Sequence, residues 1–149
     1  MQWKRIGRGD PATYVVVLQP GDETIKALTD FASTHELSAA QITAIGAFER
    51  ATVGWFDRQT AEYHPIYMDE QCEVLSLIGD VAMGAEGPLL HLHAVLGLSD
   101  GHTRGGHLLA GHVWPTLEVM ISESPAELRK TYRPDVGLAL IDIGQSVSN

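Results

Sequence analysis

Residues 89–109 read LLHLHAVLGLSDGHTRGGHLL, and this stretch decides the fold that we expect. The apolar run at 89–98 predicts a strand. Residues 99–101, Ser-Asp-Gly, have the composition of a turn, and the glycine pair at 105–106 opens a second strand that continues through Leu108 and Leu109. The stretch therefore predicts two neighbouring strands joined by a short loop.

Further strands and two helices are expected on both sides of this hairpin. The first helix has Asp22 as its N-cap and apolar residues at helical spacing up to about His35. The second begins at 124–127, Ser-Pro-Ala-Glu, which has the form of a capping box, and Ser38 with Gln41 predicts one more capped turn. The other predicted strands lie at 14–18, 42–46, 52–56, 73–80, 117–121 and 138–143. This pattern predicts an α+β fold with a largely antiparallel sheet and two main helices.

The composition predicts one acidic globular domain, because 149 residues leave little room for a second and 44% of them are hydrophobic. The formal net charge of −9 disfavours binding to phosphate backbones and to anionic membrane surfaces. Cys72 is the only cysteine, which favours a reducing compartment. The chain shows no secretion signal at its start, and no apolar run near the roughly 18 residues of a membrane span. We therefore expect a cytoplasmic protein.

Histidines are concentrated in one part of the chain, since five of the seven lie between His91 and His112. His91 and His93 are two residues apart on a predicted strand, so their imidazoles lie on the same face of it. The hairpin would bring His107, directly after the glycine pair, close to both. Three neutral imidazoles form a ligand set for zinc or a similar divalent ion and leave a fourth position for water. The alternative for each histidine by itself is a surface residue or a hydrogen-bonded core residue.

Two further residues are candidates for proton transfer at such a site. Glu118 lies within an apolar strand, where a charged side chain needs a partner or a function. It could orient a ligand histidine or act as a general base, or it could be an exposed residue of an edge strand. His112 is an odd number of residues from His107, so a regular strand would point it to the opposite face unless Gly111 introduces a bulge. His102 lies in the predicted loop, where we expect it to be exposed.

Four motifs, in this order, resemble the prokaryotic consensus of the PPC domain, the plants and prokaryotes conserved domain. They are QCEVLSL at 71–77, HLH at 91–93, GGHLLAG at 105–111 and TLE at 116–118. The similarity runs from about residue 14 to residue 143. The resemblance implies an α+β fold with an antiparallel sheet and a homotrimer. It also implies a metal, usually zinc, on His91, His93 and His107.

The resemblance also implies a second class of function, because plant members bind DNA and bacterial single-domain members are often described as DNA-binding. The plant proteins carry AT-hooks, which place arginines around a glycine to enter the minor groove. The nearest segment here is Arg8-Gly9-Asp10-Pro11, where Asp10 replaces the second arginine. Other basic residues are scattered, except for Arg129-Lys130 and Arg133. A trimer would carry three times −9, or −27, which disfavours direct DNA binding.

Two functions are therefore expected. The first is a homotrimeric zinc-binding protein whose histidine site supports hydrolysis or hydration of a small molecule, with Glu118 or His112 handling the proton. The alternative is a DNA-binding or regulatory scaffold module in which the metal is structural.

Overall fold

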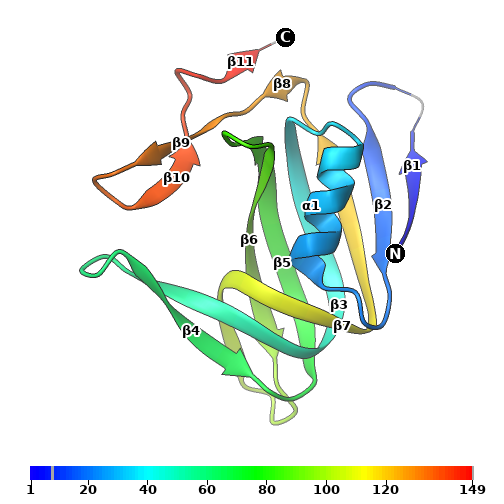
Figure 1. Cartoon of the computed structure of the whole chain (residues 1–149). Coiled ribbons are helices and arrows are strands. Elements are labelled where there is room, and N and C mark those ends of the chain that lie inside the picture. Colours follow the sequence, from blue (N-terminus) through cyan, green and yellow to red (C-terminus); the bar gives the residue numbers. More distant parts are fainter. Residues whose placement is uncertain (8, 149) are drawn as a thin grey trace.

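The computed structural model describes residues 1–7 and 9–148, and β-strands dominate it (Figure 1). Its elements are β1 (Gln2–Ile6), β2 (Thr13–Leu18), α1 (Thr24–Thr34), β3 (Ala39–Asp57), β4 (Glu62–Met68), β5 (Cys72–Met83), β6 (Pro88–Gly97), β7 (Thr103–Glu123), β8 (Ala126–Glu127), β9 (Lys130–Arg133), β10 (Leu138–Ile141) and β11 (Val147–Ser148). Strands make up 64% of the chain, and α1 is the one helix among the described residues. The expected α+β fold with two main helices is therefore wrong. The protein is mostly antiparallel sheet with one short helix.

The second predicted helix fails because tertiary pairing overrides a local signal. Ala126 and Glu127 form β8, which pairs with β11 in antiparallel fashion. The backbone N–H of Ser124, the expected cap, donates to the carbonyl of Ala39. Helix propensity is a weak preference that such long-range hydrogen bonds outweigh. The turn expected at Ser38 is also wrong, because β3 begins at the next residue.

Pairs of predicted strands merge into long bent ones. The segments at 42–46 and 52–56 are parts of β3, which has 19 residues, and those at 105–109 and 117–121 are parts of β7, which has 21. The β3–β7 register shifts at three places, one of them opposite Pro115. Bulges bend a strand without ending it, and they accommodate a proline that cannot donate to the ladder. The sequence signals that predicted breaks therefore mark bends.

The main sheet has seven strands in the order β1-β2-β7-β6-β5-β3-β4. Because β7 pairs with β6 near its start and with β3 along most of its length, β3, β5, β6 and β7 form a closed circuit of antiparallel pairings. α1 lies across one side of this circuit (Figure 1), where Leu28 and Phe31 join the buried core. We call the side that α1 covers the inner face.

The opposite side, the outer face, carries exposed apolar side chains. Side chains of cross-strand partners lie on the same face of a sheet. The pairs Thr43–Ile78, Thr43–Met120, Ile45–Glu118 and Ile78–His93 therefore share one face. The exposed fractions of Ile45 and Ile78 are 61% and 56%. We define the outer face by Thr43, Ile45, Ile78, His93, Val95, Glu118 and Met120.

α1 begins one residue later than predicted and is attached to β7. Its cap is Glu23, whose carboxylate accepts hydrogen bonds from the backbone N–H groups of Ile25 and Lys26. The same carboxylate accepts from the N–H of Gly111, and the buried Thr24 hydroxyl donates to the Gly111 carbonyl.

Within the described ranges, no helix combines the length and hydropathy that crossing a membrane requires.

The C-terminal part forms two small sheets beside the main one, at the upper left of Figure 1. β9 and β10 pair as an antiparallel hairpin, which we call the C-terminal hairpin. A bridge between Met83 and Arg129 joins its start to the end of β5. The hairpin thereby lies next to β5 and β6, where the histidines are found.

Candidate metal centre

The structure brings His91, His93 and His107 together. β6 and β7 pair in antiparallel fashion through the predicted hairpin, and His93 lies directly opposite His107. His91 lies two residues earlier on β6, and therefore on the same face as His93. Each ring offers one nitrogen, and these three nitrogens all lie within 4.8 Å of one another.

Two glycines permit this close approach. A Cβ atom on Gly106 would lie 2.5 Å from the carbonyl oxygen of Gly54, and one on Gly79 would lie 2.0 Å from the carbonyl oxygen of His91. Both distances are far below van der Waals contact, so any side chain there would push the paired strands apart. The sequence marks Gly106 only as the start of a strand, and it gives no sign of the role of Gly79.

The donor set fits a tetrahedral ion such as zinc. The Nε2 atoms of His91 and His93 are 3.1 Å apart. Two nitrogens bound to one zinc at its usual 2.0–2.1 Å are about 3.3 Å apart, although an N–H···N hydrogen bond has a similar length. Nδ1 of His107 is buried and has no hydrogen-bond partner among the described residues. A buried nitrogen without a partner is costly, and a bound ion would remove that cost if it took this atom.

The electrostatics keep at least two rings neutral. Burial lowers the pKa of His91, and the nearby ammonium of Lys130 lowers it further. Burial also lowers the pKa of His107 to about 4, with contributions from His91 and His93. Both imidazoles are therefore deprotonated at neutral pH, which is the form that binds metal.

Three residues that sequence reasoning missed surround the cluster. The ring of Tyr63, from β4, stacks on His107 with centroids 4.7 Å apart. Asp80 lies opposite His91 in the β5–β6 register, and its Oδ2 is 3.7 Å from His91 Nδ1. Its Oδ1 is 2.6 Å from Nζ of Lys130 in the C-terminal hairpin. Of these three residues, only Asp80 had a signal in the sequence, because it is a carboxylate at the end of a predicted apolar strand.

A cavity of about 180 Å³ opens beside His91 and His107. Tyr63 and Lys130 line it, together with apolar residues of β6 and of the C-terminal hairpin. The site can therefore admit a small molecule next to two of the three imidazoles.

The structure does not bring Glu118 into this cluster. Glu118 is exposed on the outer face and pairs with Val17 and Ile45 of the two neighbouring strands, so β7 is not an edge strand there. It lines a shallow hollow with the apolar side chains of Ile45, Ile78 and Met120. Its role in proton transfer stays a prediction.

His112 also lies outside the cluster. It is half-buried, pairs with Arg50 and forms an isolated bridge with Glu23 beside the start of α1. The β3–β7 register shifts just before Gly111, between residues 108 and 110, so a bulge is present near the expected place. The predicted role of His112 in proton transfer is likewise untested. His102 is exposed in its loop, as expected, and its Nδ1 is 3.0 Å from the Asp100 carboxylate.

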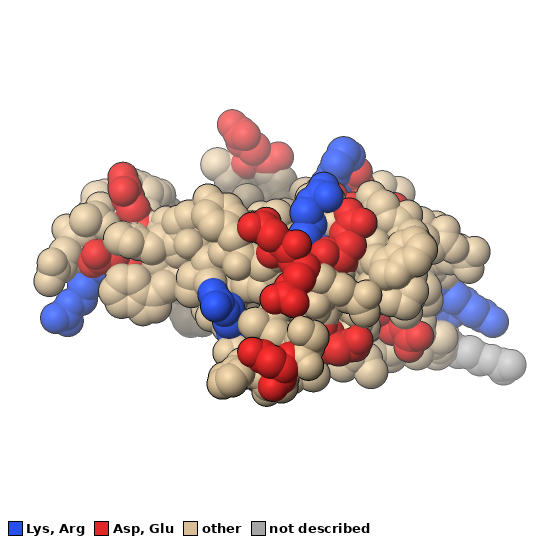
Figure 2. Space-filling model, turned by 90° about the horizontal axis from the view of Figure 1, so that it is seen from below, with Lys and Arg blue, Asp and Glu red and all other residues tan. Residues whose placement is uncertain are grey.

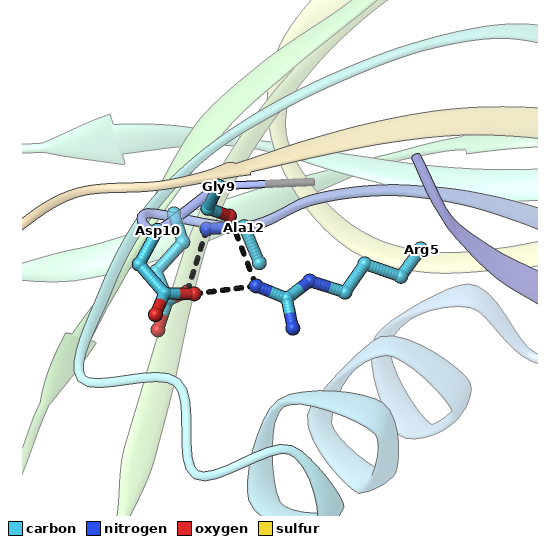
Figure 3. Close-up of polar contacts among 5 residues, drawn as sticks. Arg5, Gly9, Asp10 and Ala12 are labelled. Carbon is cyan, nitrogen blue, oxygen red and sulfur yellow. Dashed lines mark hydrogen bonds and ion pairs between the residues drawn. The ribbon is translucent and has the colours of Figure 1, made fainter. Parts of the chain in front are cut away.

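In the segment nearest to an AT-hook, Gly9 and Asp10 contact Arg5 of β1. Arg8 lies outside the described residues. Asp10 forms an ion pair with Arg5, which also donates a hydrogen bond of 3.0 Å to the Gly9 carbonyl (Figure 3). The N–H of Ala12 donates to the Glu123 carboxylate at 3.0 Å. Asp10 and Glu123 thus interact with the Arg5 side chain and the Ala12 backbone of the same chain.

The predicted basic cluster is neutralised by acidic partners. Lys130 pairs with Asp80, Arg129 with Glu127, and Arg133 with Asp135. On the face shown in Figure 2, Asp and Glu side chains form several groups, most of them near the middle, and Lys and Arg lie in small separate groups. This face of the protein would repel a phosphate backbone.

Comparisons with known proteins agree with the fold. Residues 7–125 match the sequence model of the Plants and Prokaryotes Conserved (PCC) domain. The structure is similar to that of a candidate DNA-binding protein from Bacteroides thetaiotaomicron, at 29% identity over 96% of this chain and 99% of that one, with a TM-score of 0.88. It is similar to a plant- and prokaryote-conserved (PPC) protein from Pyrococcus horikoshii, at 27% identity over 95% and 94% of the two chains, with a TM-score of 0.81.

Two further relatives show the range of proteins that contain such a region. A metal-containing protein from Archaeoglobus fulgidus is 30% identical over 87% of this chain and 92% of that one, with a TM-score of 0.80. A curated relative, the bifunctional protein GlmU of Synechococcus sp. (strain JA-3-3Ab), is 29% identical over 137 residues. The match covers 91% of this chain but only 21% of that much longer protein.

Proposed function

The chain belongs to the Plants and Prokaryotes Conserved domain family, and we propose that it is a metal-binding member whose histidine site serves hydrolysis or hydration of a small molecule. The observation that carries the proposal is the convergence of His91, His93 and His107, whose ligand atoms lie within 4.8 Å of one another. The similar protein from Archaeoglobus fulgidus is described as metal-containing. Imidazole ligands suit zinc, which is the ion we expect.

The residues around the site support an open, reactive arrangement. When bound, a divalent ion supplies Lewis acidity, which polarises a substrate and activates water. Three protein ligands leave one coordination position free. The cavity lined by His91 and His107 would let a small molecule approach an ion held by these residues.

Neighbouring side chains would hold the ligands in place. Asp80 lies on the Nδ1 side of His91, where a carboxylate favours the tautomer that leaves Nε2 free to bind a metal. Tyr63 covers one side of the His107 ring and limits its rotation. Such contacts fix the direction of the donor atoms before an ion arrives.

We further propose that the protein assembles as a homotrimer through its outer face. Ile45, Ile78, Val95 and Met120 are exposed on this face to 61%, 56%, 43% and 39%. Monomeric soluble proteins rarely leave a large apolar patch in contact with water. Covering it with neighbouring copies would also enclose Glu118. We place the protein in the cytoplasm, which the free and buried thiol of Cys72 supports.

A DNA-binding or scaffold module with a structural metal is the second candidate, and the similar Bacteroides thetaiotaomicron protein, described as a candidate DNA-binding protein, favours it. The net charge of −9 and the acidic partners of Arg129, Lys130 and Arg133 stand against direct contact with DNA. Under this alternative, DNA binding would weaken steeply with salt in a gel-shift titration. Absence of any shift at low salt would exclude direct binding.

The metal content of the purified protein tests the first proposal. We expect about one zinc ion per chain in the wild type, and the loss of most of it in His93→Ala. His102→Ala is the matched control, because His102 is an exposed loop histidine, and it should keep its zinc. Equal metal content in His93→Ala and the wild type would contradict the proposal. Chelation then separates the two candidates, since an intact oligomer with an empty site indicates an open centre, and dissociation indicates a structural ion.

A further inference from the structure

The cavity beside the histidines contains one full charge. Among the described residues that line it, Lys130 is the only one charged at neutral pH, and the rest are apolar, aromatic or imidazole side chains. Lys130 belongs to the C-terminal hairpin, which follows the region matched by the family model, residues 7–125. In a chain with a net charge of −9, a cation at this position is a local exception.

The Lys130 side chain is held inside the protein. Only 4% of it is exposed, and its Nζ lies 2.6 Å from Oδ1 of Asp80. The Asp80 carboxylate balances the charge, so the pair is tolerated in a partly buried place. An ammonium group has three N–H donors, however, and an ion pair with one carboxylate oxygen engages at most one of them. Lys130 also lines the cavity.

The shape of the cavity limits what that molecule can be. Leu89 from β6 and Leu138 and Leu140 from the C-terminal hairpin form apolar walls. The volume of about 180 Å³ equals that of about six water molecules, and it is smaller than the usual pocket for a drug-sized ligand. An ammonium group with donors left beside its ion pair, next to apolar walls, suits a carboxylate on a short hydrocarbon body.

We propose that this cavity binds a small organic carboxylate, with Lys130 Nζ donating to the carboxylate and with Leu89, Leu138 and Leu140 packing on its apolar part. This inference names small carboxylates as the substrate class of the proposed function. That these carboxylates react at the site rests on the proposed function. The binding itself needs only Lys130 and the apolar walls. A divalent ion on the histidines would add positive charge and strengthen the attraction.

Binding of butyrate to the metal-free protein tests the inference, followed by amide chemical shifts in ¹H–¹⁵N spectra. Butyramide is the matched probe, because it has nearly the same shape without the charge. We expect butyrate to shift the signals of residues 130–141 saturably, and butyramide to leave them in place. Lys130→Met should weaken butyrate binding at least about tenfold, because a charge-assisted hydrogen bond is lost. Lys130→Arg should retain it, and so should Lys26→Met, a change at an exposed lysine on α1.

Two results would overturn the inference: equal binding of butyrate by Lys130→Met and the wild type, or equal binding of butyramide and butyrate by the wild type. If Lys130→Met does not fold, the inference is tested by comparing the binding of butyrate and of butyramide by the wild type. Zinc content is measured on the same preparations. Butyrate binding without zinc binding would remove the proposed function and keep this inference, and zinc binding without butyrate binding would do the reverse.

Discussion

The two faces of the main sheet differ in the burial and the contacts of their side chains, and three consecutive residues of β6 show this difference. Leu92 is 1% exposed on the inner face and packs into the core. His91 and His93, on either side of it, leave the outer face and meet His107. The inner face therefore holds the fold together, and the outer face carries the exposed groups available for binding and assembly. Changes on the two faces should have separable effects.

The largest effect is expected from a charge placed on the outer face. Ile45→Lys should convert the proposed trimer into monomers, because it replaces an apolar contact with a charged group that would have to lose its water in each subunit contact, even with Glu118 opposite it. The monomer itself should keep its fold, since Ile45 is exposed and its cross-strand partner is Glu118. Light scattering coupled to size exclusion measures the mass.

The control for this variant is Ile143→Lys, which makes the same change at a residue that is 78% exposed in the C-terminal part. It should leave the mass unchanged. A wild type that is already monomeric at micromolar concentration would remove the proposed role of the outer face.

A smaller effect is expected from a cavity on the inner face. Leu92→Ala should lower the free energy of unfolding by about 3 kcal/mol, because it removes buried methyl groups from a closely packed core. Val95→Ala on the outer face should cost less than about 1 kcal/mol in monomeric Ile45→Lys protein. Urea unfolding of both variants in that background, without metal, gives the two values. Similar losses would show that the faces are not energetically distinct.

The smallest effect concerns a thiol on the inner face. Burial raises the pKa of Cys72 to about 11 from its usual value of 9.0, with help from Glu70 and Glu73. The folded protein should therefore react with iodoacetamide at pH 8 about a hundredfold more slowly than the urea-unfolded chain, since the thiolate is the reactive form. The rate should rise as the pH approaches 11. Equal rates for the folded and unfolded protein would mean that this part of the inner face is open to water.

Much of this arrangement could be predicted from the sequence. Apolar runs mark β2, β5, β6 and β10, and the turn and glycine pair around residue 102 predict the hairpin that brings His93 opposite His107. Local patterns failed where long-range pairing competes with them. The capping box at Ser124 begins between β7 and β8 and ends inside β8, and Pro115 lies inside β7 instead of ending it.

The surroundings of the histidines could not be predicted in the same way. Tyr63, Asp80 and Lys130 come from β4, β5 and β9, so no local spacing connects them. Asp80 meets His91 through the β5–β6 register, and Lys130 meets Asp80 only because a separate small sheet packs beside β5. Such contacts depend on the whole topology, and the sequence pattern describes only one strand or hairpin at a time.

The C-terminal hairpin has a consequence for how this protein could diversify. The three clustered histidines belong to the region matched by the family sequence model, residues 7–125, whereas Leu138, Leu140 and Lys130 belong to the segment after it. Under the proposed carboxylate binding, substitutions at Leu138 and Leu140 would change the ligand that fits without replacing a histidine. Lys130 is the exception, because its ammonium also lowers the pKa of His91.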